Sequence, residues 1–221
     1  MSAALSFALE LAAAALAPPR CAACDEPVGV LKAFCAACAS TIVPAASHEV
    51  QGCAAFHYDG AMARAIVRLK YERRPDLGRQ LGDLLWRALE SRRDALRGTV
   101  VVPVPLHATR LATRGFNQSV LLAQRVARAL HAPLWPLALR RLRDTPRQAA
   151  LDRQGRMTNV VGAFAARRAE RIRGRRVLLV DDVRTTGATL DACELALRAA
   201  GAVEVHWAAV AQAQVDAHQS V

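Results

Sequence analysis

Along this chain, short continuous runs of apolar residues alternate with segments in which apolar residues recur every three or four positions. This alternation is typical of an α/β protein. Continuous runs that suit buried strands cover 53–58, 100–105, 134–139, 160–164, 177–180 and 203–210. Apolar residues three or four apart predict helices over 61–71, 77–96, 119–131 and 186–200. Because strands alternate with helices, we expect right-handed βαβ units and a mostly parallel sheet flanked by helices.

Three other segments follow different patterns. Residues 1–17 predict a short amphipathic helix, which Pro18 and Pro19 end; Glu10 and the lack of a basic start argue against a signal peptide. Residues 42–51 form a connector, and 140–159 are polar and basic, as in a long loop or frayed helix. No apolar run reaches the roughly 18 residues that span a bilayer. We therefore expect a cytoplasmic protein with no membrane partner.

The run 177–180 is followed by two acids and a turn rich in hydroxyl groups. Asp181 and Asp182 come at the end of a predicted parallel strand, where open α/β sheets bind ligands. Residues 185–189 lead into a helix whose first N–H groups are free and partly positive, and Gly187 lets the backbone approach an anion. The stretch therefore suits a ribose phosphate, with hydroxyls on the carboxylates and phosphate on the turn.

This stretch resembles the phosphoribosyl-pyrophosphate (PRPP) signature of type I phosphoribosyltransferases and lacks the lysine of a Walker A loop. The resemblance implies a fold of that type and a site for PRPP with Mg²⁺. Its residues are Asp181, Asp182, Val183, Arg184, Thr185, Thr186, Gly187, Ala188 and Thr189. The side chain of Arg184 either pairs with a phosphate or extends into solvent.

Four of the six cysteines follow the pattern Cys21-x2-Cys24-x10-Cys35-x2-Cys38. Two such pairs offer four thiolates to one tetrahedral Zn²⁺ and leave no open coordination position, so the predicted zinc is structural. An iron–sulfur cluster and a redox dithiol pair are the alternatives. We expect an N-terminal helix and zinc-finger-like module over 1–50, followed by a phosphoribosyltransferase-like domain over 51–221.

The formal net charge of +11 suits polyanionic partners, either nucleic acid or phosphorylated metabolites. All the cationic side chains except Lys32 and Lys70 are arginines, and alanine is abundant. This composition also fits the mutational bias of a GC-rich genome. Charge alone therefore does not decide between the two kinds of partner.

From Cys21 to about residue 210, the order of motifs resembles the ComF family, the competence and gluconate-utilisation-associated phosphoribosyltransferase-like proteins of bacteria. The motifs after the cysteines are 69–71, 103–107, 114–118, Thr145 with Gln148, Arg156 with 159–160, 162–164 and 181–189. The resemblance implies a role in natural transformation, in which imported single-stranded DNA is handled in the cytoplasm. Single-stranded DNA and DNA-uptake proteins are the partners that it implies.

A second group of residues is expected to contact pyrophosphate or a nucleic-acid backbone: Lys70, Pro103, Val104, Pro105, Arg114, Asn117 and Gln118. Structural roles are the alternatives. Asn117 suits a helix cap, Phe116 a core position, and Lys70 a solvated basic helix end. Residues 106–117 are expected to form a loop, in which a lone His107 is a weak candidate for acid–base chemistry.

Two functions remain open at this point. The first is a PRPP-binding protein of DNA uptake, which would also bind single-stranded DNA. The second is an active phosphoribosyltransferase of nucleotide or other small-molecule metabolism, which transfers the pentosyl group from PRPP. The sequence shows no recognisable acceptor-binding element and no catalytic residue. A third, weaker reading makes the zinc module a surface for a DNA-uptake partner.

Overall fold

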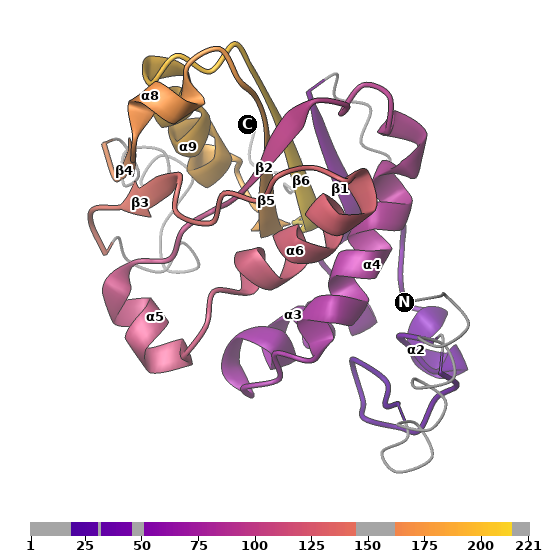
Figure 1. Ribbon diagram of the computed structural model, residues 1–221. Helices are drawn as coiled ribbons and strands as arrows, with labels where there is room; N and C mark the ends of the chain where they lie inside the picture. Colours follow the sequence, from indigo (N-terminus) through magenta and orange to yellow (C-terminus); the bar gives the residue numbers. More distant parts are fainter. Residues whose placement is uncertain (1–18, 31, 46–50, 145–161, 214–221) are drawn as a thin grey trace, which may run out of the picture.

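The computed structural model describes residues 19–30, 32–45, 51–144 and 162–213. Its centre is a four-stranded sheet with the order β1-β6-β5-β2, in which all neighbours run parallel (Figure 1). The strands are β1 (Gly52–His57), β2 (Thr99–Pro103), β5 (Arg176–Arg184) and β6 (Glu204–Gln212). The parallel sheet expected from the apolar runs is confirmed.

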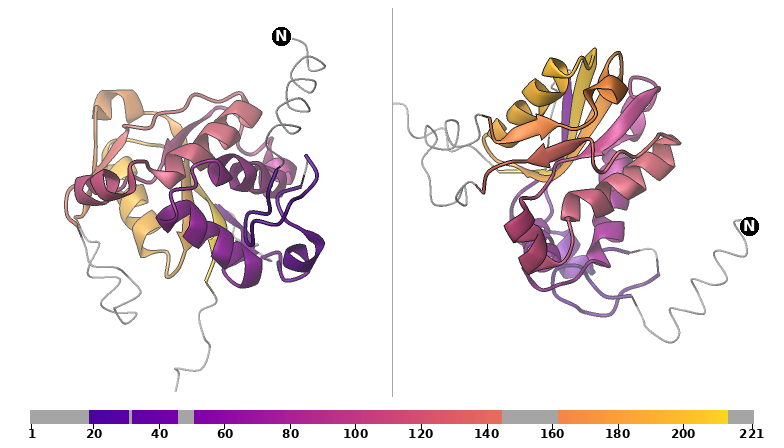
Figure 2. Two further views of the ribbon diagram at one scale, coloured as in Figure 1. Left: turned by 90° about the horizontal axis from the view of Figure 1, so that it is seen from below. Right: turned by 60° about the vertical axis from the view of Figure 1, so that its left-hand side comes forward.

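Helices cover both faces of this sheet (Figures 1 and 2). Leu178 and Val180 of β5 are buried in the core with one set of helices, whereas Val177 and Leu179 are buried in a second core on the other face. This alternation follows from the two-residue period of a strand that is apolar on both sides. The first set is α3 (Gly60–Tyr71), α4 (Leu77–Leu89) and α6 (Gln118–Leu130), and the second face carries α9 (Ala188–Ala199).

Shorter elements complete the fold. An antiparallel ribbon of β3 (Leu139–Arg141) and β4 (Phe164–Ala166) contacts α9. The remaining helices are α2 (Ala36–Ala39), α5 (Ala108–Arg114), α8 (Ala169–Ile172) and a 3-10 turn, η1 (Glu90–Arg92).

Three expectations about the extent of elements were wrong. The strand expected over 134–139 is a single bridge between Leu134 and Val101, because Pro133 and Pro136 have no N–H to donate. The helix expected to reach residue 96 ends at Leu89, since the polar run 90–95 has no apolar face to bury. The segment after 106, expected to be a loop, contains α5.

Several expectations fall outside the described residues. They are the N-terminal helix over 1–17, much of the polar segment 140–159, and the motif residues Thr145, Gln148, Arg156, Asn159 and Val160. The domain boundary at residue 50 falls in the gap 46–50 and stays a prediction.

Candidate functional site

Asp181 and Asp182 lie where one neighbouring strand has already ended. β5 pairs with β2 as far as Val180, opposite Pro103, while its pairing with β6 continues to Arg184. The two acids therefore extend beyond the end of β2. Both are still buried, with 8% and 3% of their surface exposed. Because buried carboxylates are costly without partners, their contacts decide what this site can bind.

Lys70, in the last turn of α3, is the partner of Asp182. Its Nζ lies 2.8 Å from Oδ1 of Asp182, and both side chains are largely buried. Burial lowers the pKa of Lys70, but attraction to Asp182 outweighs it and raises that pKa above its usual value. Oδ2 of Asp182 is buried and has no hydrogen-bond partner among the described residues. This oxygen can accept a ligand hydroxyl or bind a cation.

Asp181 is held by α6 and by its own backbone. Oγ of Ser119 donates a 2.9 Å hydrogen bond to Oδ1 of Asp181, and the N–H of Asp182 donates another of 2.9 Å. Burial and the neighbouring charge of Asp182 raise the pKa of Asp181 to about 7. The charge of this carboxyl near neutral pH therefore depends on what binds beside it.

The turn after β5 brings hydroxyl groups to the start of α9. Gly187 has φ +89°, a conformation that suits glycine, and α9 begins at the next residue. Thr185 and Thr189 line the cleft beside the acids. The guanidinium of Arg184 instead lies 4.6 Å from the ring centre of Trp207, which packs it against β6. The turn thus brings the N-terminus of a helix and threonine side chains together at the cleft.

Cationic side chains line the rest of the cleft, whose volume is about 430 Å³. They come from the end of α3, from α5 and from the β3–β4 ribbon: Lys70, Arg110, Arg114 and Arg141. Burial, and then the charge of Arg110, lower the pKa of Arg141. A smaller hollow of about 220 Å³ adds Arg73 between α3 and α5. The cleft therefore sets two carboxylates against several cations, which suits a phosphorylated polyol.

The structure divides the second group of predicted residues. Lys70, Val104, Pro105, Arg114 and Gln118 line the cleft. Pro103 is buried at the end of β2. Asn117 caps α6 by accepting from the N–H of Ser119 at 3.0 Å, while its Nδ2 donates to the carbonyl of Val104 at 3.0 Å. The capping interpretation of Asn117 is therefore confirmed.

Arg114 is held by two groups within the same wall of the cleft. It donates to Oε1 of Gln118, and its guanidinium lies 5.3 Å from the ring centre of Tyr71. Phe116, between them in sequence, packs against the core, as the structural alternative expected. His107 caps α5 by accepting from the N–H of Thr109. These contacts give the Arg114–Gln118 motif a fixed position beside the cleft.

Sequence reasoning missed Ser119, Arg110 and Arg141. Ser119 carried a local signal, since it stands in the first turn of a helix directly after a capping Asn. Arg110 carried none, because the segment was expected to be a loop. Arg141 reaches the cleft only because β3 pairs with β4.

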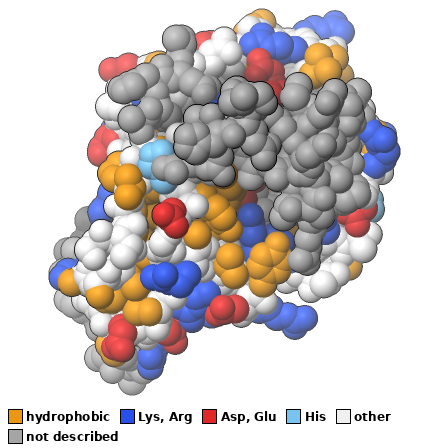
Figure 3. All heavy atoms as spheres, turned by 180° about the vertical axis from the view of Figure 1, so that it is seen from behind, with side chains coloured by type: hydrophobic (Ala, Val, Ile, Leu, Met, Phe, Trp, Pro, Cys, Tyr) orange, Lys and Arg blue, Asp and Glu red, His pale blue; other side chains and the backbone are white. Residues whose placement is uncertain are grey.

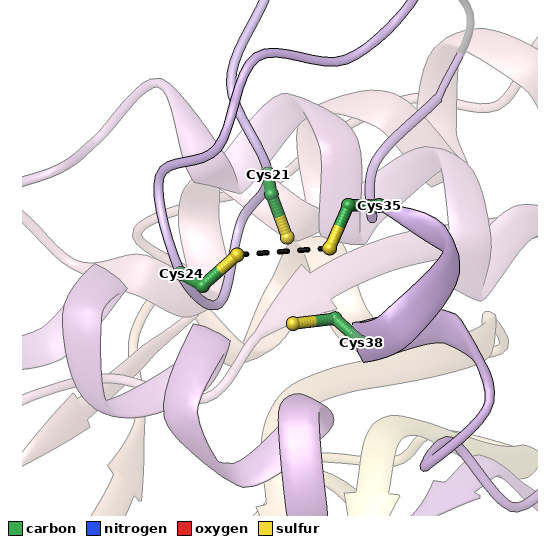
Figure 4. A group of neighbouring side chains, drawn as sticks. All are labelled: Cys21, Cys24, Cys35 and Cys38. Atoms are coloured by element: carbon green, nitrogen blue, oxygen red, sulfur yellow. Dashed lines mark hydrogen bonds between the residues drawn. The ribbon is translucent and has the colours of Figure 1, made fainter.

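The four cysteines of the N-terminal segment converge on one point (Figure 4). Their sulfur atoms all lie within 4.8 Å of one another, and the Sγ atoms of Cys24 and Cys35 are 3.7 Å apart. A tetrahedron with metal–sulfur bonds of about 2.3 Å has edges of about 3.8 Å. Four thiols with this spacing can hold one metal ion. Cys35 stands at the start of α2 and Cys38 within it.

Helix α3 connects this cysteine cluster to the cleft. Arg68 of α3 donates to the carbonyls of Cys21 and Ala22 at 3.2 Å each and pairs with Asp25 at 3.0 Å. Buried Cys21 and Cys38 also belong to the same core as Leu69. One helix therefore holds the cysteine segment and, one residue after Leu69, presents Lys70 to Asp182.

Comparisons with known proteins agree with this geometry. A family model described as the phosphoribosyl transferase domain matches residues 117–220. Competence protein F of Haemophilus influenzae is 35% identical over 156 residues, which cover 67% of each chain. The chain belongs to the ComF family. DNA utilization protein YhgH of Escherichia coli K12 is 37% identical over 153 residues, 67% of this chain and 66% of that one.

Membership of the ComF family confirms the predicted phosphoribosyltransferase-like α/β fold. The chain spans about two thirds of these relatives. Glutamine PRPP amidotransferase of Bacillus subtilis, whose structure contains ADP and GMP, matches with a TM-score of 0.43 and 26% identity, over 64% of this chain and 30% of that one. This likeness is too weak to add to the assignment. Within the described ranges, no helix has the length and apolar character to cross a membrane.

Proposed function

We propose that this ComF-family protein binds PRPP with Mg²⁺ in the cleft between β5, α3 and α5, and that it acts in DNA uptake. The observation that carries the proposal is the buried acid pair beside the Gly187 turn. One oxygen of Asp182 is paired with Lys70, and the other is buried and unpartnered. No described residue donates a hydrogen bond to this second oxygen. Buried polar atoms usually have a partner, and a ribose hydroxyl would supply the donor.

The proposed binding mode assigns each part of PRPP to a group of suitable chemistry. Ribose hydroxyls donate to Asp181 and Asp182. The 5′-phosphate accepts hydrogen bonds from the N–H groups and threonines of the turn 185–189. The pyrophosphate lies toward the cationic wall that contains Arg110, Arg114 and Arg141. Mg²⁺, when bound, offsets the charge of the pyrophosphate, and the carboxylate oxygens are the ligand type that it prefers.

We further propose that the metal of the cysteine cluster is a structural zinc ion. Four thiols leave no open position for a substrate. The segment around Cys21 and Cys38 adds only a few side chains to the core that it shares with α3, so the ion fixes its loops against that helix. Such a site needs reduced cysteines, which agrees with the cytoplasmic location that we propose.

The DNA role rests on the relatives. Their names are competence protein F and DNA utilization protein, and the chain shares two thirds of their length. We propose that this protein also binds single-stranded DNA through its basic surface. Binding to phosphates releases counterions, so the affinity should fall steeply with salt.

Active pentosyl transfer is the second candidate, and the match to the phosphoribosyl transferase domain favours it. In that case the cleft must also admit an acceptor beside the anomeric carbon. Release of pyrophosphate from PRPP, measured with candidate acceptors, separates transfer from binding alone.

The test is a calorimetric titration of PRPP with Mg²⁺ into the zinc-loaded protein. We expect wild-type protein and the control Asp83→Asn to bind PRPP equally. Asp83 of α4 pairs with Arg125 of α6, and neither residue lines the cleft. Asp182→Asn should bind at least about tenfold more weakly, since it loses a charge-assisted hydrogen bond. Thermal unfolding checks that the variant is folded. Failure of folded wild-type protein to bind PRPP would exclude the proposal.

A further inference from the structure

A second concentration of charge lies at the other end of β5 from the acids. Residues 167–176 contain six arginines and one acid, Glu170. Arg176 pairs with Glu204. The other five are exposed and have no carboxylate partner within the described part of the chain: Arg167, Arg168, Arg171, Arg173 and Arg175.

Charge alone does not select this surface, because lysine and arginine side chains are scattered over the molecule, as the rear face shows (Figure 3). Outside the PRPP cleft and the hollow beside it, the shape of this surface sets it apart from single exposed arginines. Two hollows of about 310 Å³ and 340 Å³ adjoin each other there and share Trp135 and Arg171. The first hollow also contains Arg167 and Arg168, and the second contains Arg173 and Arg175. The cations therefore line an extended surface of two hollows.

Trp135 stands where the two hollows meet, and its backbone is fixed. Its N–H donates to the carbonyl of Val101 in β2 at 2.9 Å, and its side chain is half-buried. On the other side of the first hollow, the N–H of Arg167 donates to the carbonyl of Ala138 at 2.7 Å. Arg168 has φ +55°, uncommon for a residue with a side chain, where the chain turns into α8. The aromatic ring and the arginines are thus held on one framework.

We propose that this surface, defined by Trp135, Arg167, Arg168, Arg171, Arg173 and Arg175, binds the backbone of a single-stranded nucleic acid and stacks a base on Trp135. The inference rests on the proposed role in DNA uptake and names its binding surface. Two adjoining hollows with five unpaired guanidinium groups suit a row of phosphates better than one compact anion. An aromatic ring that packs partly against the core and is partly exposed among cations, as Trp135 is, can stack a base of a single strand without sequence preference.

This surface is separate from the PRPP cleft. Asp182 lies seven positions after Arg175, which directly precedes β5, a distance of roughly 23 Å at about 3.3 Å per residue. Figure 1 shows α8 at the top of the view and α5 well below it on the same side, and α5 lines the cleft. Changes at one site therefore need not disturb the other.

The test measures binding of a fluorescent oligothymidylate by anisotropy over a range of salt concentrations. Arg167→Gln/Arg171→Gln is compared with Arg87→Gln/Arg128→Gln, which removes two exposed arginines from α4 and α6. We expect the first variant to bind at least about tenfold more weakly. Its slope of log K against log salt should fall by roughly 1.4, since two phosphate contacts are lost. The control should change less than about twofold, because its arginines lie outside the proposed surface.

Trp135→Leu tests base stacking separately from charge, because the substitution removes the aromatic ring and changes no charge. We expect a loss of about tenfold in affinity, from the lost stacking, with an unchanged salt slope. PRPP with Mg²⁺ should bind all these variants as it binds wild-type protein. Equal losses in the two arginine variants, loss only in cleft variants such as Arg114→Gln, or no oligonucleotide binding by folded wild-type protein would each overturn the proposal. None of these outcomes would affect the PRPP titration.

Discussion

The cysteine cluster and the acid cleft are the two places for which we propose a ligand, and they are assembled in different ways. All four sulfur atoms come from residues 21–38, and short turns bring them within 4.8 Å of one another. The cleft takes polar groups from α3, α5, α6, α9, β3 and β5. The first site follows from local spacing. The second exists only when the whole sheet and its helices have folded.

The two sites also treat charge differently. The four cysteines of the cluster could together bind one cation, with no coordination position left open. In the cleft, Asp182 is already paired with Lys70 while Asp181 has a pKa of about 7. We therefore propose that metal binding stabilises the first region, whereas the second retains unfavourable charge that a ligand can relieve. Four changes test this difference.

The largest effect is expected from loss of the metal. Cys21→Ser/Cys38→Ser should abolish zinc binding and lower the free energy of unfolding by several kcal/mol, because metal binding supplies much of the module's stability. Zinc content and chemical denaturation measure both effects. The control variant Cys193→Ala removes a buried thiol outside the cluster, so the protein should still bind zinc. Full stability of a zinc-free protein would contradict the structural role.

The next largest effect concerns the buried ion pair. Lys70→Met or Asp182→Asn alone should lower the free energy of unfolding by about 3 kcal/mol, since each change leaves a buried polar group without its partner. The double variant should recover part of the loss, with a coupling above about 1.5 kcal/mol. Denaturation of all four proteins gives this coupling. The more exposed pair Arg125–Asp83, at 2.7 Å, should show less than about 1 kcal/mol.

A pH dependence follows from Asp181. Its pKa is about 7 in the folded protein and about 3.9 in the unfolded chain. The folded state therefore binds more protons between these values, and its stability falls as pH rises from about 4 to 7, then levels off. Asp181→Asn should remove this component, on the order of a few kcal/mol.

Denaturation at pH values from about 5 to 8, without Mg²⁺ or PRPP, measures the slope that Asp181 contributes. Asp83→Asn should leave the wild-type slope unchanged, because Asp83 lies on the surface of α4. Identical slopes for wild-type protein and Asp181→Asn would show that Asp181 is ionised throughout this range.

The smallest effect separates backbone strain from ligand binding. Gly187→Ala and Gly98→Ala both place a Cβ at positive φ, +89° and +75°, and each should lose about 1–2 kcal/mol of stability. Only Gly187→Ala should also weaken PRPP–Mg²⁺ binding, by about fivefold, because the added Cβ stands at the phosphate turn. Calorimetry on both variants compares them. Equal affinities would remove the turn from the binding site.

Sequence predicted most of what is local in this molecule. The cysteine spacing, the apolar strand before Asp181 and the glycine turn each depend on residues close together in the chain. The parallel sheet also followed, because strands and helices alternate. Lys70 was a candidate only because its motif resembles one in the ComF family. Its ion pair with Asp182 forms only when α3 packs against the sheet.

What sequence could not predict depends on docking or on weak local patterns. Ser119 reaches Asp181 because the start of α6 lies at the end of β2, and Arg141 reaches the cleft through the β3–β4 ribbon. The guanidinium of Arg184 lies over the ring of Trp207, although Trp207 pairs with Leu179, five positions earlier in β5. Helix α5 was missed because its seven residues depend on a cap at His107 and a positive φ at Gly115.

The most direct test of the account is a crystal structure of the zinc-loaded protein with PRPP and Mg²⁺. The account predicts the 5′-phosphate on the turn 185–189, the ribose hydroxyls on Asp181 and Asp182, and Lys70 still beside Asp182. Density for PRPP in the hollow between α3 and α5, or on the arginine surface at α8, with the acids unoccupied, would contradict it.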